Sequence, residues 1–140
     1  MALCRKVLES IPEWFGIEEA NDRYISNLES LDGCVVEQDG NIVGFAGLTR
    51  YGEYSVEIDV IAVMRHLHRS GIGRMLIEYI ELELLNETTK LLHMKTLAPS
   101  KDDPNYGETR KFWLGSGFIP MEENAMWGEF NPCLVMVKPL

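Results

Sequence analysis

The chain has 140 residues, the size of one ordinary domain, and its formal net charge is −9 at pH 7. This acidic balance argues against nucleic-acid binding, which needs a basic face, and it is compatible with cationic partners. No apolar run approaches the ~20 residues that a membrane-spanning helix needs. The N-terminal segment contains Glu9 and Glu13 and no continuous apolar stretch, so we expect no signal peptide.

The cysteines also bear on the class of protein. Cys4, Cys34 and Cys133 are widely separated along the sequence. This spacing predicts neither a disulfide framework nor a metal-binding pair of thiolates, and it suits a reducing environment. We therefore expect a cytoplasmic protein without a metal site.

Helical and hairpin signals come first along the chain. Residues 11–30 begin with a proline and continue with helical apolar spacing, which predicts one or two helices ended by the Asp-Gly pair at 32–33. The apolar runs at 34–37 and 42–48 are separated by the turn residues at 39–41. This pattern predicts a β-hairpin.

Residues 54–63 predict the central strand, because apolar side chains recur at every second position and extend to both faces near its end. From Gly71 onward the apolar period becomes helical, and we expect this helix to end between residues 86 and 89. A basic loop with two glycines, Gly71 and Gly73, connects the strand to the helix.

This loop is suited to bind an anion. The first turn of a helix has backbone N–H groups without intrahelical partners, and the helix dipole adds partial positive charge there. Glycine lets an anion approach these amides closely. Basic side chains surround the loop at Arg65, His68, Arg69 and Arg74. A phosphorylated ligand is therefore predicted, although neither a Walker loop nor a complete Rossmann fingerprint is present, since Leu76 stands where the latter needs a third small residue.

The remainder of the chain predicts further strands around one short helix. Residues 91–97 predict a strand, residues 98–107 a loop, and residues 108–116 a helix closed by Gly117. Two more strands are expected, one beginning at 118–119 and one at 134–137. Without repeats or linkers, the sequence predicts a single domain over residues 1–140 with a mixed α+β order of elements.

The loop and the element order resemble those of the GNAT N-acetyltransferase superfamily. Its loop pattern is Gln/Arg-x-x-Gly-x-Gly/Ala, and this chain reads His68-Arg69-Ser70-Gly71-Ile72-Gly73. Gly117-Phe118 resembles the end of the family's Tyr-x-x-x-Gly-Phe, with Trp113 where tyrosine is common. The family's first strand is either missing or reduced to residues 3–7. The resemblance implies a mixed, mostly antiparallel sheet flanked by helices, with splayed central strands.

The resemblance implies transfer of an acetyl group from acetyl-coenzyme A to a primary amine, with a small molecule as the expected acceptor. The pantetheine arm would bind the backbone of Ile61, Ala62 and Val63. The pyrophosphate would bind His68 and the amides of the following segment, which are those of Arg69, Ser70, Gly71, Ile72, Gly73 and Arg74. Trp113 would lie beside the cofactor. A homodimer through the last strand is also compatible with such a fold.

Two other functions stay open. One is a non-catalytic module that binds or senses acyl-coenzyme A, which the replacement of tyrosine by Trp113 favours. The other is acetylation of a protein N-terminus or lysine, which needs an open groove for the acceptor.

Acetyl transfer requires that the acceptor ammonium lose a proton, and Glu57 stands where many family members carry a catalytic glutamate. Asp59 lies on the same face of the strand, roughly 7 Å along it. When two carboxylates lie this near to one another, the pKa of one of them can be raised, and a raised pKa suits a general base. The alternatives are Asp59 as base, proton transfer through ordered water alone, or a structural ion pair with Lys95 or Arg110.

The remaining candidates concern the leaving thiolate and the acceptor. Trp113 can donate a hydrogen bond but cannot supply a proton near neutral pH, so Tyr106 is the candidate acid. Trp14, Phe15 and Trp127 are candidates for a hydrophobic wall of the acceptor site, with packing in the protein core as their alternative role.

Overall fold

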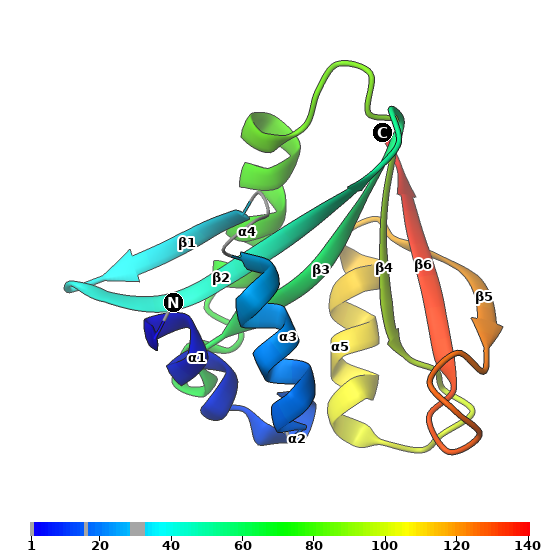
Figure 1. Cartoon of the computed structure of the whole chain (residues 1–140), viewed down its shortest axis with the longest axis horizontal. Coiled ribbons are helices and arrows are strands. Elements are labelled where there is room, and N and C mark those ends of the chain that lie inside the picture. Colours follow the sequence, from blue (N-terminus) through cyan, green and yellow to red (C-terminus); the bar gives the residue numbers. More distant parts are fainter. Residues whose placement is uncertain (1, 16, 29–32) are drawn as a thin grey trace. The chain divides into compact units, whose positions relative to one another are not determined.

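The computed structural model describes residues 2–15, 17–28 and 33–140 (Figure 1). The architecture is mixed α+β, with helices flanking a six-stranded mixed sheet in the order β1-β2-β3-β4-β6-β5. The chain divides into two compact units, so the single domain over residues 1–140 stays a prediction. The first unit is formed by Met1–Thr49 and Ile58–Glu87, and the second by Arg50–Glu57 and Thr88–Leu140.

The first unit opens with short helices, which are α1 (Ala2–Glu9), α2 (Pro12–Phe15) and α3 (Glu18–Leu28). Buried apolar residues recur with helical spacing, at Cys4, Val7, Leu8 and Ile11. This spacing explains why residues 3–7 lie in a helix and do not form a reduced first strand. Of the predicted helix stop at 32–33, Asp32 lies outside the described residues, and Gly33 begins a strand.

The predicted hairpin is confirmed. Strands β1 (Gly33–Gln38) and β2 (Asn41–Tyr51) pair antiparallel, with Gln38 opposite Asn41. The two turn residues have positive φ, 53° at Asp39 and 80° at Gly40. This is the turn geometry that matches the natural twist of two antiparallel strands.

The central strand and the glycine loop are also confirmed. Strand β3 (Ser55–Val63) leads through a 3₁₀ turn, η1 (Arg65–Leu67), into α4 (Ile72–Tyr79). The helix continues as a π-helical segment, η2 (Ile80–Leu84), and stops at Leu85, whose backbone is extended. It therefore ends earlier than predicted, because asparagine and threonine in the 86–89 segment are weak helix formers.

The second unit packs a helix, α5 (Pro104–Gly115), against strand β4 (Leu91–Leu97) (Figure 1). The first residues of β3 pair with β4 in parallel, and β4 pairs antiparallel with β6 (Cys133–Pro139). Strand β5 (Ile119–Asn124) pairs with the other side of β6.

Helix α5 begins four residues earlier than the predicted start at residue 108. The Asp103 side chain accepts hydrogen bonds from the backbone N–H groups of Asn105 and Tyr106, and Pro104 occupies the first helical position. Aspartate before proline is a strong signal for a helix start, and it outweighs the loop-forming composition of this segment. Gly117 closes the helix with a φ of 95°, as predicted.

Over the described ranges, none of the helices combines the length and the apolar character needed to cross a lipid bilayer.

Candidate active site

The N-terminus of α4 is open to an anion. Gly71 precedes the helix with a φ of 91°, a conformation that side chains other than glycine rarely adopt. No described side chain caps the helix, and the position that a Cβ of Gly71 would take has no atom within 4 Å. Arg74 is exposed in the first turn of the helix. These features fit the pyrophosphate of a nucleotide-containing substrate.

Gly44 lets strand β2 approach this loop closely. A Cβ at Gly44 would lie 3.1 Å from Cγ2 of Ile72 and 3.3 Å from the carbonyl oxygen of Ala62. Next to it, the Val43 carbonyl accepts a hydrogen bond from the N–H of Met64 at 2.8 Å. The end of β3 and the start of α4 are therefore fixed by the same two residues of β2. Gly44 is not among the residues predicted from the sequence, although a glycine inside an apolar strand indicates such a close approach.

His68 bonds to the backbone that was expected to bind pantetheine. Its Nε2 lies 2.8 Å from the carbonyl oxygen of Val63, and because a carbonyl only accepts, this nitrogen carries the proton. The Trp14 ring packs edge-on against the imidazole, with 5.5 Å between the ring centroids. Arg65 pairs with Glu13 next to these rings. The loop thus contacts α2, and the predicted site residues Trp14, Val63 and His68 lie together.

A second group of side chains surrounds Glu57. Its carboxylate is buried, with 8% of the side chain exposed. Lys95 Nζ donates a hydrogen bond to Oε2 of Glu57 at 2.7 Å, and Nδ1 of His93 lies 3.5 Å from the same oxygen. Among the two basic partners considered from the sequence, Lys95 is the one found, since Arg110 donates to the Leu97 carbonyl.

Burial and neighbouring charges shift the pKa values of the residues in this group. Burial alone would lower the pKa of Lys95, but the hydrogen bond and the charge of Glu57 outweigh it and raise that pKa. Burial lowers the pKa of His93 despite the neighbouring Glu57, and the Lys95 cation acts in the same direction as burial. Burial also raises the pKa of the Cys133 thiol. His93 is therefore mainly neutral near pH 7, which is the form that accepts a proton.

His93 is not among the residues predicted from the sequence, because a lone histidine in a strand carries no signal of a functional role. The structure shows its partners: His93 is paired with Glu57 in the parallel register of β4 and β3, so both side chains lie on one face. The Tyr51 ring packs against the imidazole at 5.5 Å between centroids. Such a cluster becomes visible only when the strand order is known.

The other predicted residues of the first unit lie on β3 and α2. Asp59 is half-buried on β3, Ala62 is buried, and Ile61 packs beside the core cluster that contains Ile72. Phe15 packs edge-on against Tyr24.

In the second unit, Tyr106 lies half-buried in the first turn of α5. Trp113 is only 2% exposed and packs between Phe112 and Phe118, so its ring belongs to the core of this unit. Trp127 lies in an irregular segment between β5 and β6 and is exposed, as are Met126 and Phe130 in the same segment. Trp127 is thus accessible to a ligand, whereas Trp113 is not.

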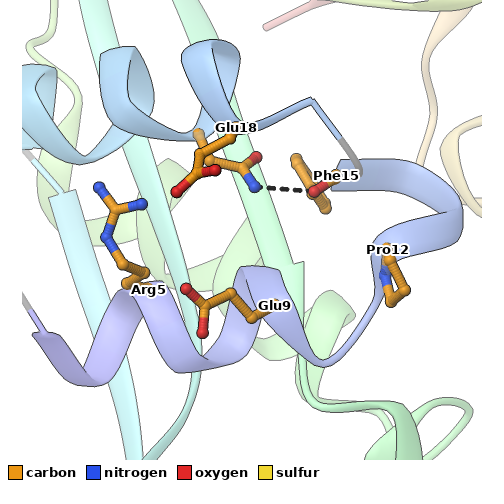
Figure 2. A pocket seen from close by; sticks show the side chains of 6 residues that line it. Arg5, Glu9, Pro12, Phe15 and Glu18 are labelled. Carbon is orange, nitrogen blue, oxygen red and sulfur yellow. Dashed lines mark hydrogen bonds between the residues drawn. The ribbon is translucent and has the colours of Figure 1, made fainter.

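A pocket of about 260 Å³ lies between α1, α2 and α3 (Figure 2). Figure 2 shows Glu9 and Glu18 on opposite sides of it, with both carboxylates toward the end where Arg5 lies and Phe15 toward the other end. Arg5 pairs with Asp22 at 2.6 Å. Because both signs of charge line this pocket, it does not specify one class of ligand.

Comparisons with known proteins agree with this geometry. Residues 3–105 match the family model described as the acetyltransferase (GNAT) family. No curated protein matches the sequence.

Solved structures share the fold over nearly the whole chain. A GNAT-family protein from Desulfovibrio desulfuricans has a TM-score of 0.81 at 21% identity, covering 99% of this chain and 90% of that chain. A GNAT family acetyltransferase from Elizabethkingia anophelis with acetyl-CoA bound has a TM-score of 0.71 at 17% identity, covering 94% and 89%. Aminoglycoside 6'-acetyltransferase type Ii has a TM-score of 0.77 at 19% identity, covering 99% and 88%.

Proposed function

Because the chain belongs to the GNAT acetyltransferase family, we propose that it transfers an acetyl group from acetyl-coenzyme A to the primary amine of a small molecule. The observation that carries the proposal is the uncapped N-terminus of α4, entered through Gly71. Acetyl-coenzyme A supplies the acetyl thioester. Residues of the chain bind this donor and transfer the protons.

The donor would bind at the glycine loop. Its pyrophosphate would lie on the amides from Arg69 to Arg74, where Gly71 leaves the backbone accessible and Arg74 adds positive charge. The pantetheine arm would bind the backbone of Ile61 and Val63. The related structure with acetyl-CoA bound supports this donor.

The Glu57 group would remove the proton from the acceptor ammonium. Glu57 is our proposed base because it is a buried carboxylate beside a half-buried histidine, and Asp59 is the second candidate carboxylate. Amine nitrogen attacks the thioester carbon, the C–N bond forms, and the C–S bond breaks as the thiolate leaves with the electron pair. The thiolate takes up the second proton of the nitrogen, and Tyr106 is the candidate residue to pass it on.

A small cationic acceptor is favoured by two observations. The chain carries a formal net charge of −9, which attracts cations. One of the structurally similar proteins is named as an aminoglycoside acetyltransferase. The exposed side chains of Trp127, Met126 and Phe130 would provide an apolar wall for the acceptor.

The test is amine-dependent release of coenzyme A thiol from acetyl-coenzyme A. A panel of primary amines, including polyamines and aminoglycosides, is added to the purified protein, and the acetylated product is identified by mass spectrometry. We expect at least one amine to stimulate release and to gain one acetyl group. Tight binding of acetyl-coenzyme A without release for any amine would contradict the proposal and favour a non-catalytic binding module.

A further inference from the structure

The Lys95 ammonium already occupies the oxygen of Glu57 that faces the neighbouring strand. Its Nζ lies 2.7 Å from Oε2, and the carboxylate is only 8% exposed. An acceptor amine that approached this oxygen would have to compete with a hydrogen-bonded lysine held on an adjacent strand. Glu57 is thus well placed to provide negative charge and poorly placed to contact the acceptor itself.

His93 is more accessible than Glu57. Its side chain is 19% exposed, and its Nδ1 lies 3.5 Å from the Glu57 oxygen. When Nδ1–H faces a carboxylate, the imidazole is fixed in the tautomer whose Nε2 is free to accept a proton. The Tyr51 ring packs against the imidazole and limits its rotation.

We propose that His93 is the catalytic residue that takes the proton from the acceptor ammonium, with Glu57 as its counter-ion and Lys95 as the residue that holds Glu57. The inference rests on the proposed function and refines it, since the base assigned to Glu57 is carried by the His93–Glu57 pair. The ammonium N–H bond breaks, its electron pair stays on the amine nitrogen, and the proton binds Nε2. The imidazolium then releases this proton to solvent.

The electrostatic surroundings support this role. The described charged groups that shift the pKa of His93 are Glu57 on β3 and Lys95 on β4. The phenol ring of Tyr51 contacts the His93 imidazole, and the residue opposite His93 on β6 is the apolar Val137. Burial and Lys95 favour the neutral ring before the reaction, and Glu57 stabilises the cation that forms when the proton is taken.

The kinetic test compares His93→Gln with His66→Gln, a matched change in an exposed residue of the loop before α4. We expect His93→Gln to lower kcat about 100-fold or more, to leave the KM for acetyl-coenzyme A nearly unchanged, and to remove the acidic limb of the kcat/KM profile that reports this histidine. His66→Gln should behave like the wild type. Unchanged kcat and an unchanged acidic limb in an active His93→Gln protein would overturn the inference.

A second test needs no turnover. NMR titration of the imidazole signals should place the pKa of His93 below that of a free histidine. Glu57→Gln should lower this pKa further, and Lys95→Met should raise it. A His93 pKa that does not respond to Glu57→Gln would show that the two side chains are not coupled and would overturn the inference.

The two tests separate the inference from the proposed function. If the wild type acetylates an amine and His93→Gln does so equally well, only the role of His93 is wrong. If the wild type acetylates no amine in the panel, the proposed function is wrong and the role of His93 is wrong with it.

Discussion

Lys95 and Glu57 form a hydrogen-bonded ion pair across two parallel strands, with 2.7 Å between Nζ and Oε2. The carboxylate is buried, whereas 26% of the lysine side chain is exposed. The pair places a fixed negative charge beside His93 at the start of β4. It connects the stability of the second unit to the chemistry that we propose for it.

Replacement of Lys95 by methionine should destabilise the protein, because it leaves a buried carboxylate without its ammonium partner. We expect the free energy of unfolding to fall by about 1–3 kcal/mol, reduced from the value for fully buried pairs by the partial exposure of the lysine. Denaturant unfolding followed by circular dichroism measures the change. The control is Lys111→Met, which removes an exposed pair with Glu108 and should cost no more than about 0.5 kcal/mol. Equal losses in the two variants would contradict the prediction.

Stability should fall as the pH drops through the titration range of His93. Its pKa is lowered in the folded protein relative to the ordinary value of 6.5, so the unfolded chain binds more protons in the interval between the two pKa values. Stability therefore rises with pH across that interval and is lost on acidification. Denaturant unfolding should show a smaller loss between about pH 7 and about pH 5 in His93→Gln than in the wild type. The same loss in both would exclude His93 as its source.

The stabilisation that Lys95 provides should be lost at high pH, whereas that of His93 is lost at low pH. Because its pKa is raised in the folded protein above 10.5, the stabilisation is fully present below that value and is lost as the pH rises through the folded pKa. Above about pH 10, the midpoint temperature of thermal unfolding should thus fall more steeply with rising pH in the wild type than in Lys95→Met. Parallel profiles would show that the ion pair does not affect stability.

Glu57→Gln keeps the shape of the side chain and removes its charge. We expect acetyl transfer to fall about 10²–10⁴-fold with the fold retained, because the His93–Glu57 pair loses the negative charge that stabilises the protonated imidazole. The control is Glu53→Gln, which changes an exposed carboxylate in the preceding turn and should keep full activity. Undiminished turnover by Glu57→Gln would remove this carboxylate from the reaction.

Gly71→Ala tests the glycine loop. Alanine at a φ of 91° should cost about 1–2 kcal/mol of stability and should weaken acetyl-coenzyme A binding, since the loop must shift to relieve the strain. Gly40→Ala introduces comparable strain in the hairpin turn, where φ is 80°. It should destabilise the protein to a similar extent and leave the affinity for acetyl-coenzyme A unchanged. Equal affinities in the two variants would argue against donor binding at Gly71.

The sequence was sufficient for the elements that depend on local signals. The turn at Asp39 and Gly40, the strand over residues 55–63 and the glycine loop follow from turn chemistry and apolar periodicity, which act over a few residues. Helix boundaries were predicted less accurately. The start of α5 differs from the prediction because Asp103 caps the helix, and the π-helical form of residues 80–84 has no local sequence signal.

The candidate site was predictable only in part. Gly71 was predicted from the local pattern of a glycine loop at a helix start, and Glu57 from resemblance to the family. Lys95 was one of two possible partners considered for Glu57. The choice between these partners, the place of His93 beside the pair and the close approach at Gly44 depend on strand pairing between segments far apart in the sequence. Pairing of this kind is set by tertiary packing, which neither spacing nor composition encodes locally.

Calorimetric titration of the wild-type protein with acetyl-coenzyme A, with ATP and NAD as controls, tests most directly whether the Gly71 loop binds the acyl donor. We predict saturable binding of acetyl-coenzyme A, weaker binding of ATP and NAD, and a loss of affinity in Gly71→Ala that Gly40→Ala does not share. A folded protein that gives no heat with acetyl-coenzyme A would contradict donor binding, and with it the assignment of acetyl transfer.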